Sequence, residues 1–232
     1  MAFNRVLVNV LPQKFLGVLP LFIGVEIILG IAILNKASGL YGILSLLTGH
    51  PINFLQWLYN MIALLILPFY AMALINLKNK PRNVRKLSLA TLIYILDTGI
   101  GCLYTLYFTY YWFYVEDTDA TINARRDTVD DDLSRQSASQ TRELFITFST
   151  TVVITVVRFY FTLVMVSFTR LLLKQHISEI SNTSGEGVVQ HNVDEEEEEI
   201  LGSTGMIGEV KKAVLDLELR SKEFLIRWLA QY

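Results

Sequence analysis

The stretch LFITFSTTVVITVVRFYFTLVMVSFTRLLL, residues 144–173, decides the fold class of this chain. It is mostly apolar and exceeds the roughly 20 residues that an α-helix needs to cross a bilayer. Segments 15–34, 54–77 and 87–113 have the same character. In lipid, every backbone N–H and C=O must be hydrogen-bonded within its own segment, so each stretch should be helical. The sequence therefore predicts an all-α integral membrane protein with four transmembrane helices.

The overall composition agrees with a membrane protein. Of the 232 residues 52% are hydrophobic, and the mean hydropathy is +0.41. The first apolar segment is longer than the core of a cleaved signal peptide and contains Glu26, so we expect it to be retained. The single cysteine, Cys102, excludes an intrachain disulfide and a cysteine-based metal site.

Lysines and arginines predict the orientation in the membrane. The connection 78–86 carries five of them, and the face that it shares with both termini carries nine against five on the opposite face. Because basic residues favour the cytosolic side, the N-terminus (1–14), the 78–86 loop and the tail after residue 173 should be cytosolic. The lumenal face should then hold the loops 35–53 and 114–143. Its five basic residues are Lys36, Arg125, Arg126, Arg135 and Arg142.

The acidic loop 114–143 contains the pair Arg125-Arg126. A polar lumenal loop is accessible to a processing protease of the kexin type, which cleaves after paired basic residues. Other basic pairs exist at Arg85-Lys86 and Lys211-Lys212, as expected by chance. Only Arg125-Arg126 is predicted to be lumenal, so we interpret 114–143 as a processing loop.

The polar tail divides into two parts. Residues 174–205 include five consecutive glutamates and should form a disordered acidic spacer, because like charges repel one another. Apolar residues recur at helical spacing in 206–232, which predicts a cytosolic amphipathic helix. This helix could lie on the membrane, bind a partner or fold back on the bundle. The residues that we expect to contact a partner or the membrane are Lys211, Lys212, Arg220, Arg227 and Trp228.

Three charged residues fall well inside the predicted spans: Glu26, Asp97 and Arg158. A charge near the bilayer centre costs about 2.5 to 3.5 kcal/mol on insertion scales, so such groups usually find a partner. We hypothesise that Arg158 forms an ion pair with Asp97 or Glu26. In the alternatives, the acids are protonated and Arg158 reaches a lipid phosphate, or Arg158 contacts a substrate headgroup in a partner subunit.

No catalytic pattern stands out. The histidines do not form a Ser/His/Asp arrangement, a metal cluster or a phosphate-binding glycine loop, and His50 beside Pro51 is better interpreted as a turn residue. The residues favour a membrane subunit, adaptor or cargo receptor without catalytic residues, cofactor, metal or nucleic-acid partner. A small transporter stays open, since buried charges also mark transport paths.

The segment KFLGVLPLFIGVEIILGIAILNKASGLYGILSLLTGHPINFLQW (14–57) resembles the regulatory subunit of fungal inositol phosphorylceramide synthase. The resemblance continues through YILDTGIGCLYTLYFTYYWFYVEDT (94–118) and RFYFTLVMVSF (158–168). It implies a non-catalytic, multi-pass subunit in the Golgi membrane. The subunit would support and localise a separate catalytic subunit, which transfers phosphoinositol from phosphatidylinositol to ceramide.

The resemblance also implies kexin-type cleavage between the third and fourth spans, which fits Arg125-Arg126. Cleavage would leave fragments 1–126 and 127–232, held together by helix packing. It further implies that the tail engages the COPI retrieval coat. Because the chain does not end in a dilysine signal, we expect any such contact to use the internal basic residues of the tail.

Overall fold

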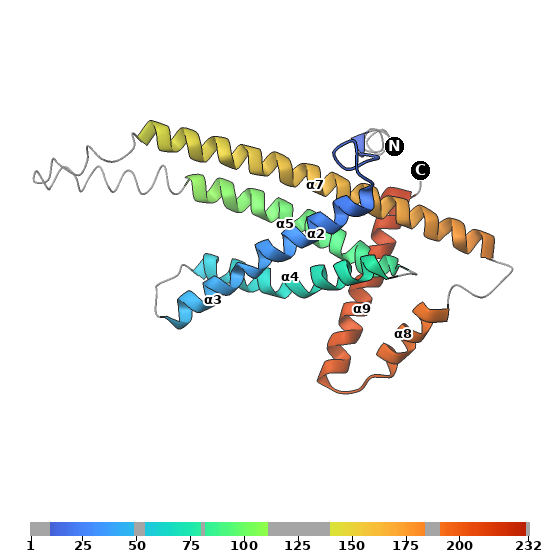
Figure 1. Ribbon diagram of the computed structural model, residues 1–232. Coiled ribbons are helices and arrows are strands. Elements are labelled where there is room, and N and C mark those ends of the chain that lie inside the picture. The colour runs from blue at the N-terminus through green and yellow to red at the C-terminus, as the bar shows by residue number, and fades with distance from the viewer. Residues whose placement is uncertain (1–9, 49–53, 80–81, 111–139, 184–190, 231–232) are drawn as a thin grey trace, which may run out of the picture. The chain divides into compact units, whose positions relative to one another are not determined.

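A computed structural model describes residues 10–48, 54–79, 82–110, 140–183 and 191–230. Their regular elements are helical apart from an isolated bridge between Phe15 and Leu19. Four helical segments are long and apolar enough to cross a membrane, as the sequence predicted: Leu21–Leu44, Trp57–Lys78, Val84–Tyr107 and Phe145–Ser178 (Figure 1).

The first long helix, α2 (Leu21–Ala37), begins six residues later than the predicted start at residue 15. A tight turn comes before it, in which Leu16 and Gly17 have positive φ angles of 51° and 76°. Pro20 then takes an extended conformation at the N-cap. Positive φ is incompatible with a right-handed helix, so the apolar pattern alone placed the helix start too early.

The predicted loop 35–53 contains a further helix, α3 (Gly39–Leu47). It packs against α4 (Phe54–Lys78), which carries Pro68 in its interior. The close approach depends on Gly42, because a Cβ at that position would overlap the side chain of Asn60. Part of the predicted lumenal loop therefore joins the helical body.

The helix α5 (Val84–Tyr110) begins three residues before the predicted span 87–113, and α7 (Gln140–Thr183) runs beyond both ends of the predicted span 144–173. The extension of α7 and a separate helix α8 (His191–Gly202) occupy most of the segment 174–205. The prediction of a disordered spacer was therefore wrong for its described residues. Glutamate is a good helix former, and the repulsion within the acidic run is offset by basic residues of α5 described below.

The tail ends in α9 (Met206–Leu225), which continues as one π-helical turn, η2 (Ile226–Ala230). One side of α9 is buried and includes Gly208, Leu215, Glu218, Ser221 and Leu225. Several apolar side chains elsewhere on the helix remain exposed, among them Ile207, Val210, Leu217 and Phe224.

The chain divides into two compact units, and α5 and α7 each contribute to both. The first comprises the described parts of Met1–Tyr94 and Leu163–Tyr232. Its core combines residues from several helices, including Val25, Ile28, Tyr70, Leu87 and Met165. A buried hydrogen bond between the Thr91 and Thr169 hydroxyls, 2.7 Å long, links α5 to α7 there.

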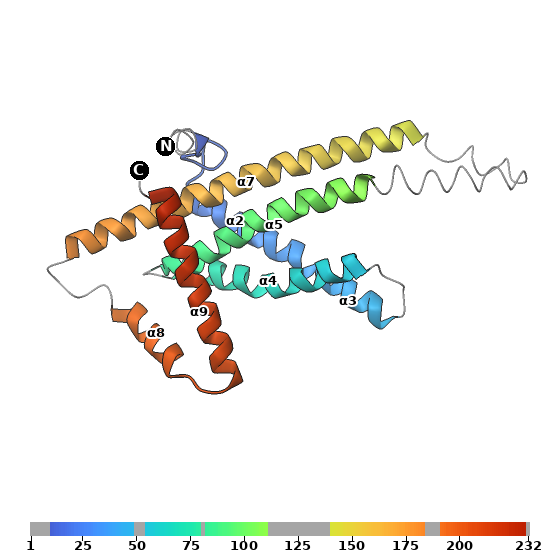
Figure 2. The same cartoon turned by 180° about the vertical axis from the view of Figure 1, so that it is seen from behind.

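The second unit, Ile95–Thr162, pairs the end of α5 with the start of α7, as Figures 1 and 2 show. The hydroxyls of Thr98 and Thr162 lie 3.1 Å apart in this pair. Polar contacts between Thr side chains thus join α5 and α7 within each unit. Hydroxyl groups are effective between helices in lipid, where water does not compete for them.

Candidate functional site

The strongest polar site of the described residues lies where α4 is followed by α5. The Asn76 side-chain amide donates to the Asn83 carbonyl at 2.7 Å, and the Asn83 backbone N–H donates to Asn76 Oδ1 at 2.9 Å. Asn83 Oδ1 also accepts from the Arg85 backbone N–H at 3.1 Å. Asn83 therefore caps the start of α5, a role for which asparagine is among the preferred residues.

The second and third residues of α5, Arg85 and Lys86, are cationic and meet the acidic helix α8. Arg85 is buried, and its guanidinium is ion-paired with Glu197 and, at 3.5 Å, with Glu196. Lys86 is ion-paired with Glu196 Oε1. Glu196 Oε2, the oxygen that faces Arg85, also accepts from the Asn83 side-chain amide at 3.1 Å. We call Asn83, Arg85 and Lys86 the basic cradle.

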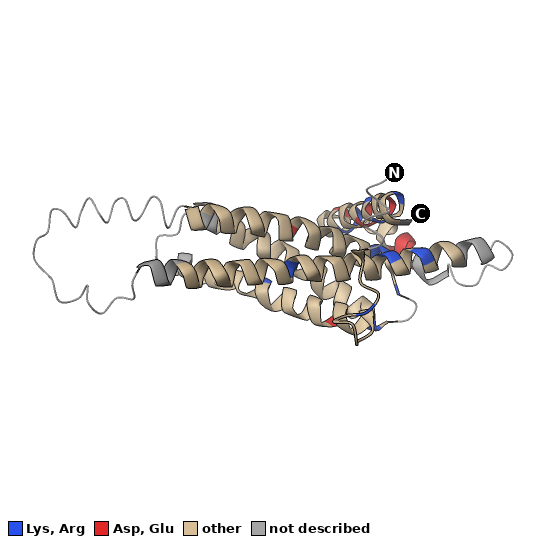
Figure 3. Ribbon diagram, turned by 90° about the horizontal axis from the view of Figure 1, so that it is seen from above, with Lys and Arg blue, Asp and Glu red and all other residues tan. Residues whose placement is uncertain are grey.

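The tail helix α9 adds a carboxylate and an amine next to the basic cradle. Burial raises the pKa of Glu218, while Lys86 and Arg85 act in the opposite direction and Glu196 adds to the rise. Burial also lowers the pKa of Lys222, and the positive charge of Arg85 lowers it further. Charged positions gather on α8, α9 and the helix ends beside them, whereas fewer of them lie along the middle of the long helices (Figure 3).

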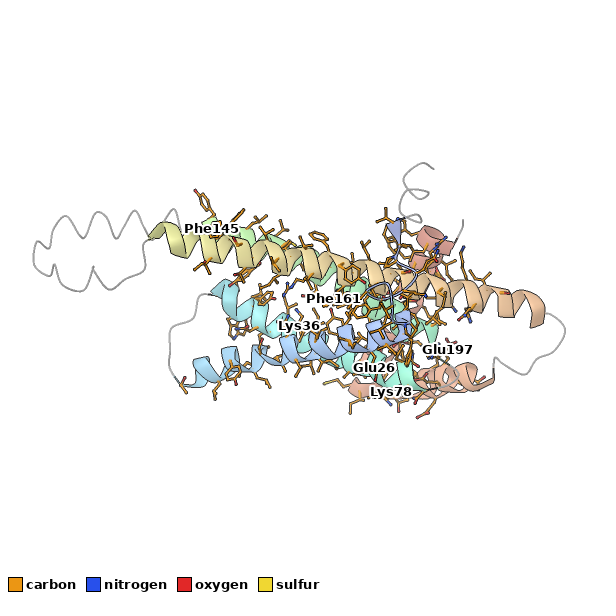
Figure 4. The ribbon with its side chains drawn as sticks, turned by 45° about the horizontal axis from the view of Figure 1, so that its top comes forward. Glu26, Lys36, Lys78, Phe145, Phe161 and Glu197 are labelled. Atoms are coloured by element: carbon orange, nitrogen blue, oxygen red, sulfur yellow. The ribbon has the colours of Figure 1, made fainter. Side chains whose placement is uncertain are left out.

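Of the three charges predicted inside the spans, Glu26 has a partner from α4. Its carboxylate lies 3.1 Å from Lys78 Nζ, at the end of α4, and Figure 4 shows the two side chains together. Nearby, the Arg82 guanidinium lies 4.9 Å from the centre of the Phe22 ring. Sequence reasoning had weighed Glu26 as a partner of Arg158 and had used Lys78 only to orient the chain.

The other two intramembrane charges lie in the second unit. Arg158 Nη1 lies against Gly101, and a Cβ at that position would overlap it. Asp97 is one helical turn before Gly101 on the same face of α5. The backbone carbonyl of Arg158 accepts from the Thr162 hydroxyl at 2.9 Å. Because Gly101 has no side chain, the Arg158 guanidinium can lie against the backbone of α5 at this position.

Sequence reasoning missed the burial of Lys36. Only 2% of this residue is exposed, and its ammonium lies 5.4 Å from the centre of the Tyr59 ring on α4. An aromatic face attracts a cation, which helps to accommodate the buried charge. Nothing in the sequence pairs these two positions, because the contact depends on how α2 packs against α4.

The predicted processing residues, Arg125 and Arg126, lie outside the described residues. In the tail, Arg220 is ion-paired with Asp216 at 2.9 Å and Arg227 with Glu223 at 4.0 Å, while Lys212 lies 3.7 Å from Glu209. Lys211 is exposed, and the Trp228 ring stacks on Phe224 with centroids 6.4 Å apart. Within the described part of the chain, no group of three His, Cys, Asp or Glu side chains could hold a metal ion.

The family model for inositolphosphorylceramide synthase subunit Kei1 matches residues 14–176. This chain belongs to the Kei1 family. The match includes the basic cradle and ends before α8 and α9 begin.

Two relatives carry the corresponding name. The inositol phosphorylceramide synthase regulatory subunit KEI1 of Saccharomyces cerevisiae is 40% identical over 175 residues, which cover 70% of this chain and 78% of the relative. The regulatory subunit kei1 of Schizosaccharomyces pombe is 33% identical over 101 residues, or 44% of this chain and 42% of that protein. No solved structure matches the chain.

Proposed function

We propose that this protein is the regulatory, non-catalytic subunit of inositol phosphorylceramide synthase. It would support a separate catalytic subunit that transfers phosphoinositol from phosphatidylinositol to ceramide. The observation that carries this proposal is the family match over residues 14–176, which includes almost all of the four membrane-crossing segments. Both named relatives are regulatory subunits of the same synthase.

Exposed apolar helix faces support a role as a membrane subunit. The first half of α7 exposes a run of large apolar side chains, which includes Phe145, Phe148, Val153, Val156 and Phe159. On α4, Leu65 and Ile75 are likewise exposed. In a bilayer such faces are covered by lipid tails or by the helices of a partner. The catalytic subunit could therefore bind to these helix faces within the membrane.

The proposed location and processing rest on the sequence and on the family resemblance. We propose that the protein resides in the Golgi membrane with both termini in the cytosol, and that a kexin-type protease cleaves after Arg125-Arg126 in the lumen. The tail would engage the COPI coat through its internal basic residues. Lys211 supports this role because it is exposed, whereas Arg220 and Arg227 are ion-paired along their own helix.

We further propose that Arg158 pairs with Asp97 inside the membrane. Glu26 has Lys78 as its partner, and Asp97 shares a face of α5 with Gly101, against which the guanidinium lies. Charge reversal by Arg158→Asp should destabilise the protein, and the added change Asp97→Arg should restore its level in the membrane. Glu26→Arg serves as the control and should not rescue. Failure of the Asp97 exchange would remove the proposed pair.

The function is tested by purifying the tagged protein in mild detergent, identifying the membrane proteins that accompany it and assaying phosphoinositol transfer to ceramide. We expect a stoichiometric polytopic partner and transferase activity, and depletion of the protein should mislocalise that partner. Recovery of a lone, inactive protein, with lipid synthesis unchanged after depletion, would contradict the proposal. It would favour an independent transporter or cargo receptor.

A further inference from the structure

The basic cradle is chemically suited to bind a phosphate group. It combines the Arg85 guanidinium, the Lys86 ammonium and the Asn83 side-chain amide at the start of a long helix. Arginine and lysine are the main cationic partners of phosphate, and the start of a helix favours an anion through its dipole. In this structure the carboxylates of Glu196 and Glu197 occupy the positions that phosphate oxygens would take.

The cradle also lies where two membrane-crossing segments meet in sequence. The membrane-crossing segment Trp57–Lys78 ends just before it, and the segment Val84–Tyr107 begins within it. Cationic side chains at the end of a membrane span commonly meet the headgroup layer. A lipid phosphate can therefore approach these residues from the membrane itself.

The acidic helix α8 packs beside α9 and meets α5 through charged side chains. Of its described large apolar side chains, Ile200 is partly buried and Leu201 is 61% exposed. Glu196 and Glu197 face the cradle with their side chains 37% and 31% exposed, while Glu198 and Glu199 are exposed. Adjacent carboxylates repel one another, so the helix depends on the cations of the cradle. Such a contact can be displaced by a competing anion.

We infer that the basic cradle is a binding site for the phosphomonoester group of an anionic membrane lipid, and that α8 is its built-in competitor. With α8 seated, Glu196 and Glu197 neutralise Arg85 and Lys86 and close the site. When a lipid phosphate enters, it replaces these two carboxylates and releases α8. The cradle belongs to the region that the family model matches and α8 does not, so the competitor is an addition of the tail.

The test uses the full chain in phosphatidylcholine bilayers with and without phosphatidic acid. Hydrogen–deuterium exchange over residues 191–202 reports whether α8 is seated. Phosphatidic acid should increase exchange in this helix and leave α4 unchanged. Bilayers with phosphatidylserine, whose phosphate is a diester, provide the charge control, and inorganic phosphate tests whether a soluble anion suffices. Release by phosphatidic acid alone identifies a lipid headgroup as the source, and release by inorganic phosphate identifies a free one.

Two double glutamine variants distinguish the effect of the α8 carboxylates that contact the cradle from the effect of net charge alone. Glu196→Gln with Glu197→Gln should increase the affinity for phosphatidic acid about tenfold, if the seated helix leaves about one site in ten open. The matched control, Glu198→Gln with Glu199→Gln, removes the same charge from the exposed side of the run and should leave the affinity unchanged. Lys86→Gln should weaken binding, and it changes a partly exposed residue that the fold tolerates more readily than a change at Arg85.

Several results would overturn this inference. One is the absence of phosphate binding in both the wild-type chain and the Glu196/Glu197 variant. Equal gains in the two glutamine variants, or equal release of α8 by phosphatidylserine, would show a non-specific effect of charge. Unchanged binding in Lys86→Gln would place the lipid elsewhere. None of these results depends on whether the protein accompanies a transferase, so they do not test the proposed function.

Discussion

Gly24 shows how a single residue fixes the start of α2. The turn before the helix folds Phe15 back onto it, so that a Cβ at Gly24 would lie 2.6 to 2.7 Å from three carbon atoms of the Phe15 side chain. Phe15 is itself buried, with only 4% of the residue exposed. The absence of a side chain at this position therefore allows the turn and the helix to pack together.

Gly24→Ala should destabilise the protein by about 1 to 3 kcal/mol, the usual cost of overpacking a core. Gly30→Ala is the matched control, because a Cβ there meets nothing within 4 Å on the same helix. It should be neutral or stabilise by up to about 1 kcal/mol, since alanine is a better helix former than glycine. Thermal unfolding in detergent measures both, and equal midpoints would contradict the packing argument.

Glu218 should make stability depend on pH. Its pKa is raised above the ordinary value of 4.5, mainly by burial, while Lys86 and Arg85 oppose the rise and Glu196 adds to it. The folded state therefore retains the proton to higher pH than the unfolded state does. This contribution to stability is fully present below the ordinary pKa and is lost as the pH rises through the raised one.

Wild-type protein should thus gain stability relative to Glu218→Gln as the pH falls from neutral towards the ordinary carboxyl pKa of 4.5. Thermal unfolding of both proteins across this window gives the difference. Glu223→Gln removes an exposed carboxylate from the same helix and should keep the wild-type pH dependence. A constant difference between wild type and Glu218→Gln across the window would contradict the prediction.

At the scale of elements, hydroxyl pairs connect α5 with α7. Thr91 and Thr169 are fully buried, and their hydroxyls are hydrogen-bonded to each other. The described parts of this helix pair have few other polar contacts. Removing one hydroxyl leaves the other without its partner in an apolar surrounding. Removing both replaces the pair with methyl groups of similar volume, which is less harmful than leaving one hydroxyl alone.

Thr91→Val or Thr169→Val should therefore each cost about 0.6 kcal/mol, with an upper limit of about 1.7 kcal/mol, as for other hydrogen bonds between membrane helices. The double variant should lose less than the sum of the two single losses. Thr150→Val on the exposed side of α7 is the control and should have little effect. Strict additivity in a double-mutant cycle would show that the two hydroxyls do not interact.

At the scale of the whole molecule, the question is whether a cut in the segment 111–139 separates the chain. The second half of α7 contributes buried side chains to the core of the first unit, among them Val164, Met165, Phe168 and Leu173. Two sets of polar contacts join residues on opposite sides of the cut: the hydroxyl pair of Thr91 and Thr169, and the ion pairs between the basic cradle and Glu196. These contacts do not require an intact connection.

We expect the two pieces to stay together after cleavage between Arg126 and Asp127. A site for a sequence-specific protease, inserted there and cut in the purified full chain, should leave both pieces in one peak on size exclusion in mild detergent. The uncut protein is the reference. Separate peaks under these conditions would show that the helix contacts are too weak to hold the fragments.

The sequence by itself determined the four membrane-crossing helices, because a bilayer forces each segment to satisfy its backbone internally whatever its neighbours are. It also singled out Glu26, Asp97 and Arg158 as charges in need of partners. It did not determine the turn before Leu21, where Phe15 packs against Gly24, or the burial of Lys36 against Tyr59.

Only the tertiary structure decided the state of the acidic run. Five consecutive glutamates predict disorder when only their mutual repulsion is considered. Their counterions lie on α5, and Lys86 and Glu196 are separated by 110 residues of sequence. A local pattern carries no information about a partner so distant in the chain. The fold of the first unit brings these charges together, and the described part of the run is helical.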